Sequence, residues 1–433
     1  MTPAARLAAA IEVFATIETQ RRPAAELLKS WGAAHRFAGS GDRAGIAGLV
    51  YDALRRKASS AFLMGADTPR AILLGMLVRE RGLDIDAIAR LADGTGYGPE
   101  ALSDGERAKI ADANLSGAPP HVVGDYPEWL DPHFTRAFGD DRAEEGVALA
   151  SRAPLDLRVN TLKASRDKGA DLLSDLKPET GRWSPWSLRI RLGADAKSPP
   201  IHAEPSFIKG MIEVQDEGSQ LAALLSGAKP GEQVIDLCAG AGGKTLALAA
   251  MMDNKGQIYS TDDDKRRLAP IHDRLARSGA RNVQVRTPKS VGSEIADLAG
   301  RCDLALIDAP CTGTGAWRRN PDAKWRMRPG ALEQRQKEQI DVLERALPVL
   351  KGSGRIAYVT CSVLEEENGA QVRAFLARHP EFSVQPPAEV AAGLGENAFL
   401  FTRAARMSAE GLLMTPRTTE TDGFFVSVLR RAG

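Results

Sequence analysis

From Gly231 onward, short apolar runs alternate with stretches of helical periodicity. Apolar strands separated by helices are typical of a mostly parallel sheet covered by helices on both faces. We therefore predict an α/β fold for this part of the chain, with strands at residues 234–237, 258–261, 283–286, 304–307 and 356–360. Ligands of such sheets bind at the carboxyl ends of the strands.

The length of the chain indicates more than one domain, because a single hydrophobic core stops growing well below 433 residues. Residues 1–120 have apolar side chains three and four positions apart and are predicted to form an all-α domain. Proline and glycine then interrupt the pattern, so residues 121–205 are predicted to be a linker and a small α+β module. Residues 206–433 form the predicted α/β domain.

The overall charge and the cysteine pattern exclude several classes of protein. A net charge of +1 provides no general attraction to polyanions, so a nucleic-acid surface would need local patches. The four cysteines form no CxxC pair and the six histidines show no zinc spacing. We expect a cytoplasmic monomer with no metal and no membrane segment.

A glycine-rich turn at residues 236–245 joins the first predicted strand to a helix, so backbone N–H groups can approach a ligand closely. A phosphate-binding loop would need glycine where Cys238 stands, and a dinucleotide fingerprint would need glycine at Thr245. A third possibility is an adenosyl cofactor, with Asp262 at the end of the second strand holding the ribose hydroxyls. A fourth is a tight turn that binds nothing.

Two cysteines follow predicted strands, Cys311 after Asp308 and Pro310, and Cys361 after a threonine. A single cysteine of this kind is usually an inert, buried residue. Two of them beside a glycine-rich turn indicate covalent catalysis next to a nucleotide-like cofactor. The other two cysteines, at positions 238 and 302, are expected to be buried packing residues, the first offering only its backbone.

These motifs resemble the Sun/Fmu (Nop/Sun) family of S-adenosylmethionine-dependent RNA cytosine-5 methyltransferases. The resemblance rests on the turn at 236–245, the Pro-Cys motif at 308–315 and the Thr-Cys motif at 358–362 with 366–368. Segments 157–163, 215–220 and 422–425 also match, and 42–55 resembles the antitermination-factor-like helical domain of the bacterial ribosomal-RNA branch. The resemblance implies a Rossmann-like class I methyltransferase domain preceded by an all-α domain that binds RNA.

By this resemblance, Cys361 is the nucleophile and Cys311 assists release of the covalent adduct. Asp308 is placed to hydrogen-bond the exocyclic amine or ring nitrogen of the base, and the alternative is an aspartate that caps a turn. Lys244 is expected to contact Asp308 or the cofactor turn, and the alternative is a solvated lysine at the start of a helix. Carbon 5 of cytosine is a poor nucleophile, so a thiolate adds to carbon 6 before methyl transfer. DNA cytosine-5 enzymes attack from a single Pro-Cys cysteine, so the second cysteine favours RNA as substrate. The cofactor would be S-adenosyl-L-methionine, bound by Cys238, Ala239, Gly240, Ala241, Gly242, Gly243, Lys244, Asp262, Arg267 and Asp308.

The predicted partner is ribosomal RNA of the small subunit. A segment after the Pro-Cys motif combines cations with two tryptophans, as single-strand RNA recognition requires. The expected RNA contacts are Arg158, Asn160, Lys163, Trp317, Arg318, Arg319 and Lys324. A tryptophan-containing structural loop is the alternative for this segment.

Two further functions stay open at this point. An RNA-binding assembly factor that has lost turnover is the first, and a P-loop-like NTPase is the second. The chain departs from the family in one respect, because residues 285–289 contain no acidic side chain to contact the adenine amine. Adenine recognition would then come from main-chain groups or be weaker.

Overall fold

The computed structural model describes residues 1–193, 199–288, 292 and 294–431, which form two compact units. The helical unit contains Met1–Arg152 and Trp317–Arg328. The sheet unit contains the other described residues, beginning at Ala153.

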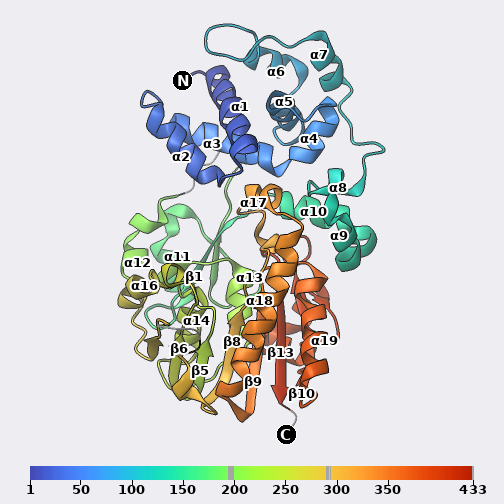
Figure 1. Ribbon diagram of the computed structural model, residues 1–433. Coiled ribbons are helices and arrows are strands. Elements are labelled where there is room, and N and C mark those ends of the chain that lie inside the picture. Colours follow the sequence, from blue (N-terminus) through green and yellow to red (C-terminus); the bar gives the residue numbers. More distant parts are fainter. Residues whose placement is uncertain (194–198, 289–291, 293, 432–433) are drawn as a thin grey trace. The chain divides into compact units, whose positions relative to one another are not determined.

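The helical unit has an apolar core built from its longest helices (Figure 1). Helix α1 begins where the side chain of Thr2 accepts a hydrogen bond from the backbone N–H of Ala5, a standard N-cap. The helices are α1 (Pro3–Gln20), α2 (Ala24–Ala34), α3 (Ser40–Arg55), α4 (Lys57–Met64), α5 (Pro69–Arg79), α6 (Ile85–Leu91), α7 (Asp104–Ala111), α8 (Pro120–Val123), α9 (Asp131–Phe138), α10 (Arg142–Ala150) and α17 (Pro321–Arg326).

The sheet unit is built on a nine-stranded sheet in the order β11-β12-β13-β9-β8-β5-β6-β7, with β10 paired to β13. Strands β9, β8, β5, β6 and β7 run parallel, and β13 joins β9 antiparallel. The strands are β5 (Gln233–Asp236), β6 (Gln257–Ser260), β7 (Val283–Val285), β8 (Cys302–Asp308), β9 (Leu350–Thr360), β10 (Phe382–Val384), β11 (Arg406–Met407), β12 (Leu412–Met414) and β13 (Phe424–Arg431).

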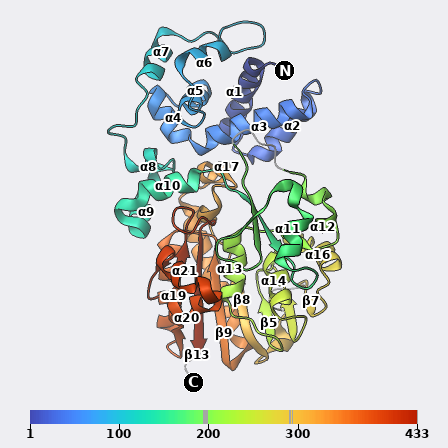
Figure 2. The same cartoon turned by 180° about the vertical axis from the view of Figure 1, so that it is seen from behind.

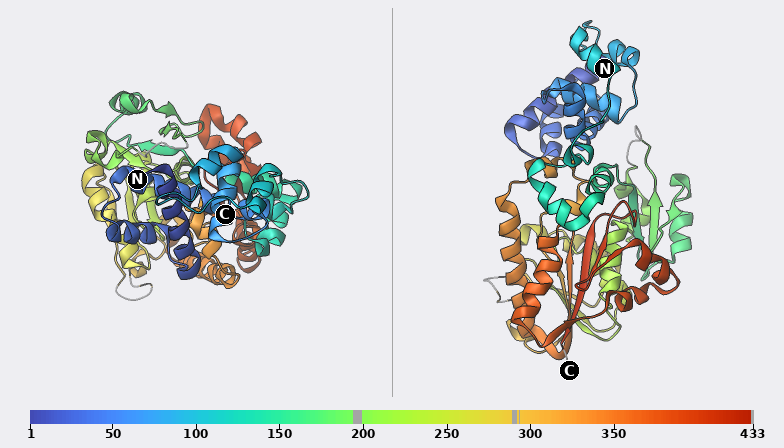
Figure 3. Two further views of the ribbon diagram at one scale, coloured as in Figure 1. Left: turned by 90° about the horizontal axis from the view of Figure 1, so that it is seen from above. Right: turned by 90° about the vertical axis from the view of Figure 1, so that its right-hand side faces the viewer.

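Helices cover both faces of this sheet. Helices α13, α14, α20 and α21 pack on one face against β5, β6, β8 and β9 (Figure 2), and α18 and α19 pack on the other. The right-hand view of Figure 3 shows these helical layers on opposite sides of the sheet. The helices are α13 (Glu217–Leu225), α14 (Gly243–Met251), α15 (Lys265–Leu268), α16 (Ile271–Ser278), α18 (Gly330–Ala346), α19 (Gly369–Arg378), α20 (Pro387–Ala391) and α21 (Ala398–Ala404).

A small antiparallel sheet in the order β2-β3-β1-β4 precedes the large one. Its buried Arg189 pairs with Asp156 at 2.7 Å and with Glu217 at 3.2 Å, and Glu217 lies at the start of α13. The ion pairs therefore tie the small sheet to the first helix of the large-sheet region. The elements are β1 (Leu155–Val159), β2 (Glu179–Thr180), β3 (Ser187–Ile190), β4 (Ile212–Val214), α11 (Arg166–Leu172) and α12 (Pro205–Ile208).

The predicted α/β class and the five predicted parallel strands are confirmed, each strand overlapping an observed one. The division at residues 120 and 205 stays a prediction about domain roles. As compact units, residues 121–152 lie with the helices and the described residues of 153–205 lie with the sheet. Among the described residues no single helix is long and apolar enough to cross a membrane, while the bent pair α4 and α5 passes that test by length and composition.

Candidate active site

The glycine-rich turn leaves the carboxyl end of β5 and enters α14 at the switch point of the sheet, where β6 lies on one side of β5 and β8 on the other. Asp236, the last residue of β5, is fully buried and accepts a 2.7 Å hydrogen bond from the Thr245 hydroxyl. Gly242 precedes α14 with φ of +82°, in the left-handed region that favours glycine. The turn therefore leaves the start of α14 open at the carboxyl edge of the sheet.

Gly242→Ala is expected to lower the thermal stability of the protein. The added Cβ would lie 2.4 Å from Cγ1 of Ile271, and the backbone conformation is strained for alanine. The two effects together should cost roughly 2–4 kcal/mol. Thermal melting measures the loss, with Gly227→Ala as a control, because that glycine has φ of +68° and no atom within 4 Å of its added Cβ. Equal melting temperatures for both variants would contradict the predicted clash.

Asp262 follows β6 and is 2% exposed. One carboxylate oxygen accepts the N–H of Gly240 at 3.0 Å, and the other accepts the N–H of Asp264 at 3.0 Å. Arg267 lies 3.8 Å from the first oxygen. The carboxylate is thus held rigidly at the turn, where its remaining lone pairs can accept hydroxyl protons.

A cavity of about 320 Å³ opens beside this carboxylate. Its volume falls in the usual range for small-molecule sites, and its walls combine apolar side chains with several charged groups. Behind it, one oxygen of Asp236 is buried with no hydrogen-bond partner among the described residues. The residues present therefore fit a nucleoside-containing cofactor. The lining residues are Cys238, Asp262, Asp263, Asp264, Arg267, Pro310, Arg335, Glu338, Asp341, Val342 and Arg345.

Burial raises the pKa of Asp236 to about 7, although the hydrogen bond from Thr245 opposes the shift. Between about pH 4 and pH 7, Asp236 is therefore protonated in the folded protein and ionised in the unfolded chain. In this window stability falls as pH rises. Asp236→Asn removes the titration and retains the acceptor for Thr245, so its melting temperature relative to wild type should rise by several degrees between pH 5 and pH 8. A difference that does not change with pH would contradict this.

Lys244, the second residue of α14, is 7% exposed and donates a 2.7 Å hydrogen bond to Asp308 at the end of β8. Its ammonium also lies 5.0 Å from the centre of the Phe424 ring. The predicted contact between Lys244 and Asp308 is confirmed, and the alternative of a solvated lysine is wrong. The ion pair joins the glycine-rich turn to the strand that carries the Pro-Cys motif.

The two cysteine sulfurs lie 3.3 Å apart. Cys311 follows β8 and Cys361 follows β9, and these neighbouring strands run parallel with Asp308 opposite Val359. Their carboxyl ends therefore meet at one edge of the sheet. The hydrogen bond to Cys361 and burial raise the pKa of Cys311 well above its ordinary value. Cys311 therefore stays a thiol at neutral pH, and either sulfur can donate the hydrogen bond between them.

Glu367 holds the two cysteine loops together, a role that the sequence did not reveal. Its carboxylate accepts the backbone N–H of Thr312 at 2.8 Å and the amide of Gln339 at 3.0 Å. Its own carbonyl accepts the hydroxyl of Tyr358 in β9. The carboxylate is buried, so its position fixes the loop after Cys311 against the strand that leads to Cys361.

A close approach of two backbones also fixes this region. A Cβ on Gly315 would lie 2.1 Å from the carbonyl oxygen of Gly423, whose N–H donates to the carbonyl of Gly315 at 2.8 Å. The N–H of Gly315 in turn donates to the carbonyl of Cys361. Only glycine fits here, so the Pro-Cys motif, the Thr-Cys motif and segment 422–425 meet in space.

The remaining cysteines differ from each other. Cys302 is fully buried in the core, as predicted, and burial raises its pKa to about 11. Cys238 is partly buried, packs against the same core and lines the cavity beside Asp262. The expectation that it offers only its backbone to a ligand stays a prediction.

The predicted RNA segment after the Pro-Cys motif lies in the helical unit instead of forming an exposed loop. Trp317 is 2% exposed and stacks on Phe134, with ring centres 5.8 Å apart. Arg318 is buried, and its carbonyl accepts a hydrogen bond from Arg55. The expectation that Trp317 and Arg318 are displayed to RNA is contradicted by this burial, and Arg319 is partly buried.

Lys324, in α17, is 1% exposed and donates to the backbone carbonyls of Arg55 and Asp125 at 2.9 and 2.6 Å. Burial lowers its pKa to about 7. An ammonium held by two carbonyls inside a core cannot neutralise a phosphate, so its expected RNA contact is likewise contradicted. Neighbouring Trp325 donates to the carbonyl of Leu54. The segment packs as a structural part of the helical unit.

The other three predicted RNA contacts form internal hydrogen bonds in the sheet unit. Arg158 is 1% exposed and donates to Gln215 at 2.7 Å. Asn160 is 3% exposed and donates to two backbone carbonyls. Lys163 is exposed, but its ammonium donates to the carbonyls of Lys209 and Arg277. Burial thus removes the first two from any surface, and contact of Lys163 with RNA stays a prediction.

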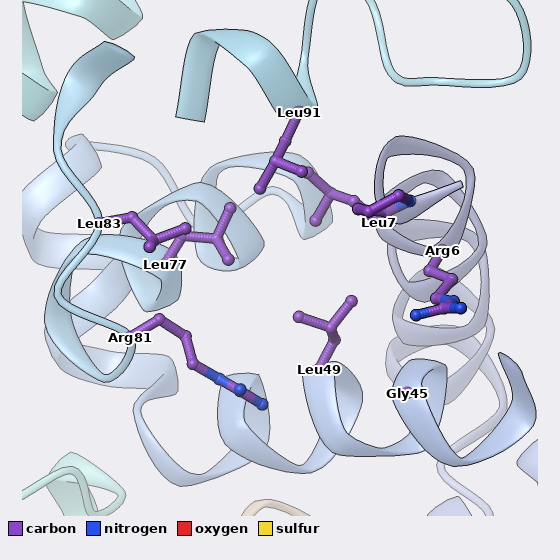
Figure 4. A pocket seen from close by; sticks show the side chains of 9 residues that line it. Arg6, Leu7, Gly45, Leu49, Leu77, Arg81, Leu83 and Leu91 are labelled. Carbon is purple, nitrogen blue, oxygen red and sulfur yellow. The ribbon is translucent and has the colours of Figure 1, made fainter. Parts of the chain in front are cut away.

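A second cavity, of about 370 Å³, lies among the helices of the helical unit (Figure 4). Leucines from four helices and a loop face it, and Arg6 and Arg81 lie at its edge. Arg6 pairs with Asp42, and Arg81 pairs with Asp52. The sequence did not indicate this cavity, because its leucines belong to separate elements.

The chain is similar in sequence to known ribosomal RNA methyltransferases. Residues 223–430 match the family described as 16S rRNA methyltransferase RsmB/F. The probable ribosomal RNA small subunit methyltransferase B of Synechocystis sp. is 31% identical over 71% of this chain and 67% of its own length. The ribosomal RNA small subunit methyltransferase B of Sodalis glossinidius is 33% identical over 76% of this chain and 68% of its own length. The alignments thus span about two thirds of these relatives.

Two solved structures are similar in fold. A methyltransferase homolog from Pyrococcus horikoshii has a TM-score of 0.58 at 27% identity, covering 72% of this chain and 97% of that one. NSun6 from the same organism, in a structure with SFG, has a TM-score of 0.60 at 21% identity over 72% of this chain and all of that one. Both support the Rossmann-like fold deduced from the strand order.

Proposed function

Because this chain belongs to the 16S rRNA methyltransferase RsmB/F family, and is therefore a methyltransferase, we propose that it methylates carbon 5 of a cytosine in ribosomal RNA of the small subunit. The observation that carries the proposal is the pair of thiols 3.3 Å apart at the carboxyl edge of the sheet. Cytosine carbon 5 needs activation by a nucleophile at carbon 6, and a second thiol can assist its release. The names of the relatives support ribosomal RNA as the substrate.

The methyl donor is S-adenosyl-L-methionine, as expected from the sequence, and when bound it supplies an electrophilic methyl group. We assign its binding to the cavity beside Asp262. The Asp262 carboxylate would accept the ribose hydroxyls, as a strand-end carboxylate does in related nucleotide sites. The backbone of residues 238–243 and Lys244 would border the rest of the molecule. Arg267 would hold Asp262 from the solvent side.

The thiolate of Cys361 adds to carbon 6 of the cytosine, forming a carbon–sulfur bond and moving an electron pair toward carbon 5. After carbon 5 is methylated, its proton leaves to a base, the pair of the carbon–hydrogen bond restores the double bond, and the carbon–sulfur pair returns to Cys361. The S–H of Cys311 donates to this sulfur and stabilises the departing thiolate.

Asp308 is placed to orient the base. One of its oxygens accepts the hydrogen bond from Lys244, and the carboxylate side chain is one-third exposed. Its free lone pairs can therefore accept the exocyclic amine of cytosine. Uracil has a carbonyl at that position and would be rejected, because two acceptors would face each other. The target base must be unpaired or flipped, since a duplex hides carbon 6.

Transfer of labelled methyl from S-adenosyl-L-methionine to unmodified small-subunit ribosomal RNA tests the proposal, with transfer RNA and DNA as parallel acceptors. The RNA is then digested to nucleosides, and label is expected in 5-methylcytidine from ribosomal RNA alone. Label in another nucleoside would contradict the cytosine-5 assignment. Cofactor binding with no transfer to naked RNA or to precursor subunits would instead favour an RNA-binding assembly factor.

A further inference from the structure

The cofactor cavity contains a carboxylate that the sequence did not identify. Residues 285–289, at and after the end of β7, contain no acidic side chain. Five carboxylates line the cavity: Asp262, Asp263, Asp264, Glu338 and Asp341. A carboxylate can accept a hydrogen bond from a purine amine only where its oxygens are not already taken by other donors.

Four of the five carboxylates already have partners. Asp262 accepts from the Gly240 turn, and Asp263 forms an ion pair with Arg345 at 2.7 Å. Asp264 caps α15 by accepting the N–H of Arg266 at 2.8 Å. Glu338 pairs with Arg335 at 2.5 Å. Among the described residues, the carboxylate of Asp341 alone in this group has no hydrogen bond or ion pair.

The face of α18 explains how Asp341 reaches the cavity. Residues 338, 341, 342 and 345 are spaced three, four and seven apart, so they share one side of the helix, and all four line the cavity. Val342 from this helix and Pro310 from the loop after β8 are the apolar parts of the wall. An apolar surface beside a free carboxylate matches a purine, which has a flat apolar face and an amine on its edge.

Glu294 is the other acidic group near this wall. It pairs with Arg345 at 3.1 Å, and its second oxygen is buried with no hydrogen-bond partner among the described residues. It does not line the cavity, so Arg345 lies between it and any ligand there. Glu294 therefore positions Arg345, whereas Asp341 faces the open volume.

We propose that Asp341 determines the specificity of this site for adenine by accepting the exocyclic amine of the cofactor's purine. The inference rests on the proposed function, because it assigns the adenosyl group to this cavity. Asp341 thus supplies a carboxylate from α18, on a different element from Asp262. A hypoxanthine ring carries a carbonyl oxygen at the same position and would face Asp341 as a second acceptor.

The test compares binding of S-adenosyl-L-homocysteine and S-inosyl-L-homocysteine to the full chain by calorimetry. Wild type should bind the adenosyl compound at least about tenfold more tightly than the inosyl compound, as expected for a hydrogen bond to a charged group. Asp341→Asn should lose most of that preference, because an amide can accept from an amine or donate to a carbonyl. The affinity of the adenosyl compound itself should fall by about tenfold.

Two control variants sharpen the result. Glu338→Gln changes the paired carboxylate on the same face, and Glu333→Gln changes an exposed one on the same helix that does not line the cavity. Both should keep the adenine preference. Unchanged preference in Asp341→Asn, or its loss in Glu338→Gln alone, would overturn the assignment. If wild type prefers the adenosyl compound and Asp341→Asn loses that preference, but no methyl is transferred to RNA, only the proposed function is contradicted.

Discussion

Cys361→Ala should abolish methyl transfer, lowering turnover by roughly 10⁴-fold or more, as is typical when a covalent nucleophile is removed. The variant should still bind S-adenosyl-L-homocysteine, because Cys361 does not line the cofactor cavity. Labelled-methyl transfer measures turnover, and calorimetry measures cofactor affinity. Full turnover in Cys361→Ala would show that the assigned nucleophile is wrong.

The companion variant Cys311→Ala separates the two thiols. Addition through Cys361 is retained, but the donor to the departing sulfur, 3.3 Å away, is lost. A covalent protein–RNA adduct should therefore accumulate and appear as a shifted band on a denaturing gel. Cys302→Ala serves as the control, because this cysteine is buried in the core away from the site and should give no adduct. An adduct in Cys361→Ala but not in Cys311→Ala would reverse the two roles.

Trp317→Ala should destabilise the helical unit by about 3–5 kcal/mol, the usual cost of deleting a large buried aromatic side chain. The indole is 2% exposed and completes a stack with Phe134, which itself stacks on Tyr126 at 4.2 Å. Thermal or denaturant unfolding of the full chain measures the loss. Tyr97→Ala is the matched control, because this side chain is 90% exposed.

The same variants decide between the structural and RNA-contact roles of the segment. If Trp317 stacked on RNA from an exposed loop, its replacement would weaken RNA binding and leave the unfolding transition unchanged. Because Trp317 and Lys324 are buried, we expect the replacement of Trp317 to change mainly the unfolding transition. A normal unfolding transition in Trp317→Ala, accompanied by weak RNA binding, would restore the original expectation.

The periodicity of the sheet region was sufficient to predict the five parallel strands. Strands that are apolar on both faces need helices on both sides of the sheet. Strands that alternate with helices in the chain therefore form a mostly parallel sheet. The pattern also placed Cys311 and Cys361 after two consecutive predicted strands, whereas only the structure shows that these strands are neighbours in the sheet. Their encounter then follows, since parallel neighbours end at the same edge.

Other parts of the site depend on contacts between residues far apart in the chain. Glu367 and Gly423 lie in segments that carry the family resemblance, but their contacts with Thr312 and Gly315 are visible only in the structure. The free carboxylate of Asp341 became visible only once the partners of its four neighbours were known. A sequence motif reports residue type and order, whereas availability for a ligand depends on which groups already have partners.

The prediction that segment 317–328 is exposed to RNA was wrong. Cations and tryptophans in alternation are compatible both with an RNA surface and with a core that buries indoles and satisfies cations with carbonyls. Local composition therefore cannot separate the two possibilities. The sequence by itself determined the α/β class, the family and the two thiols, because these depend on short-range pattern. Only the tertiary structure decided which charged and aromatic side chains are buried and which are free to bind, because burial depends on what packs against them.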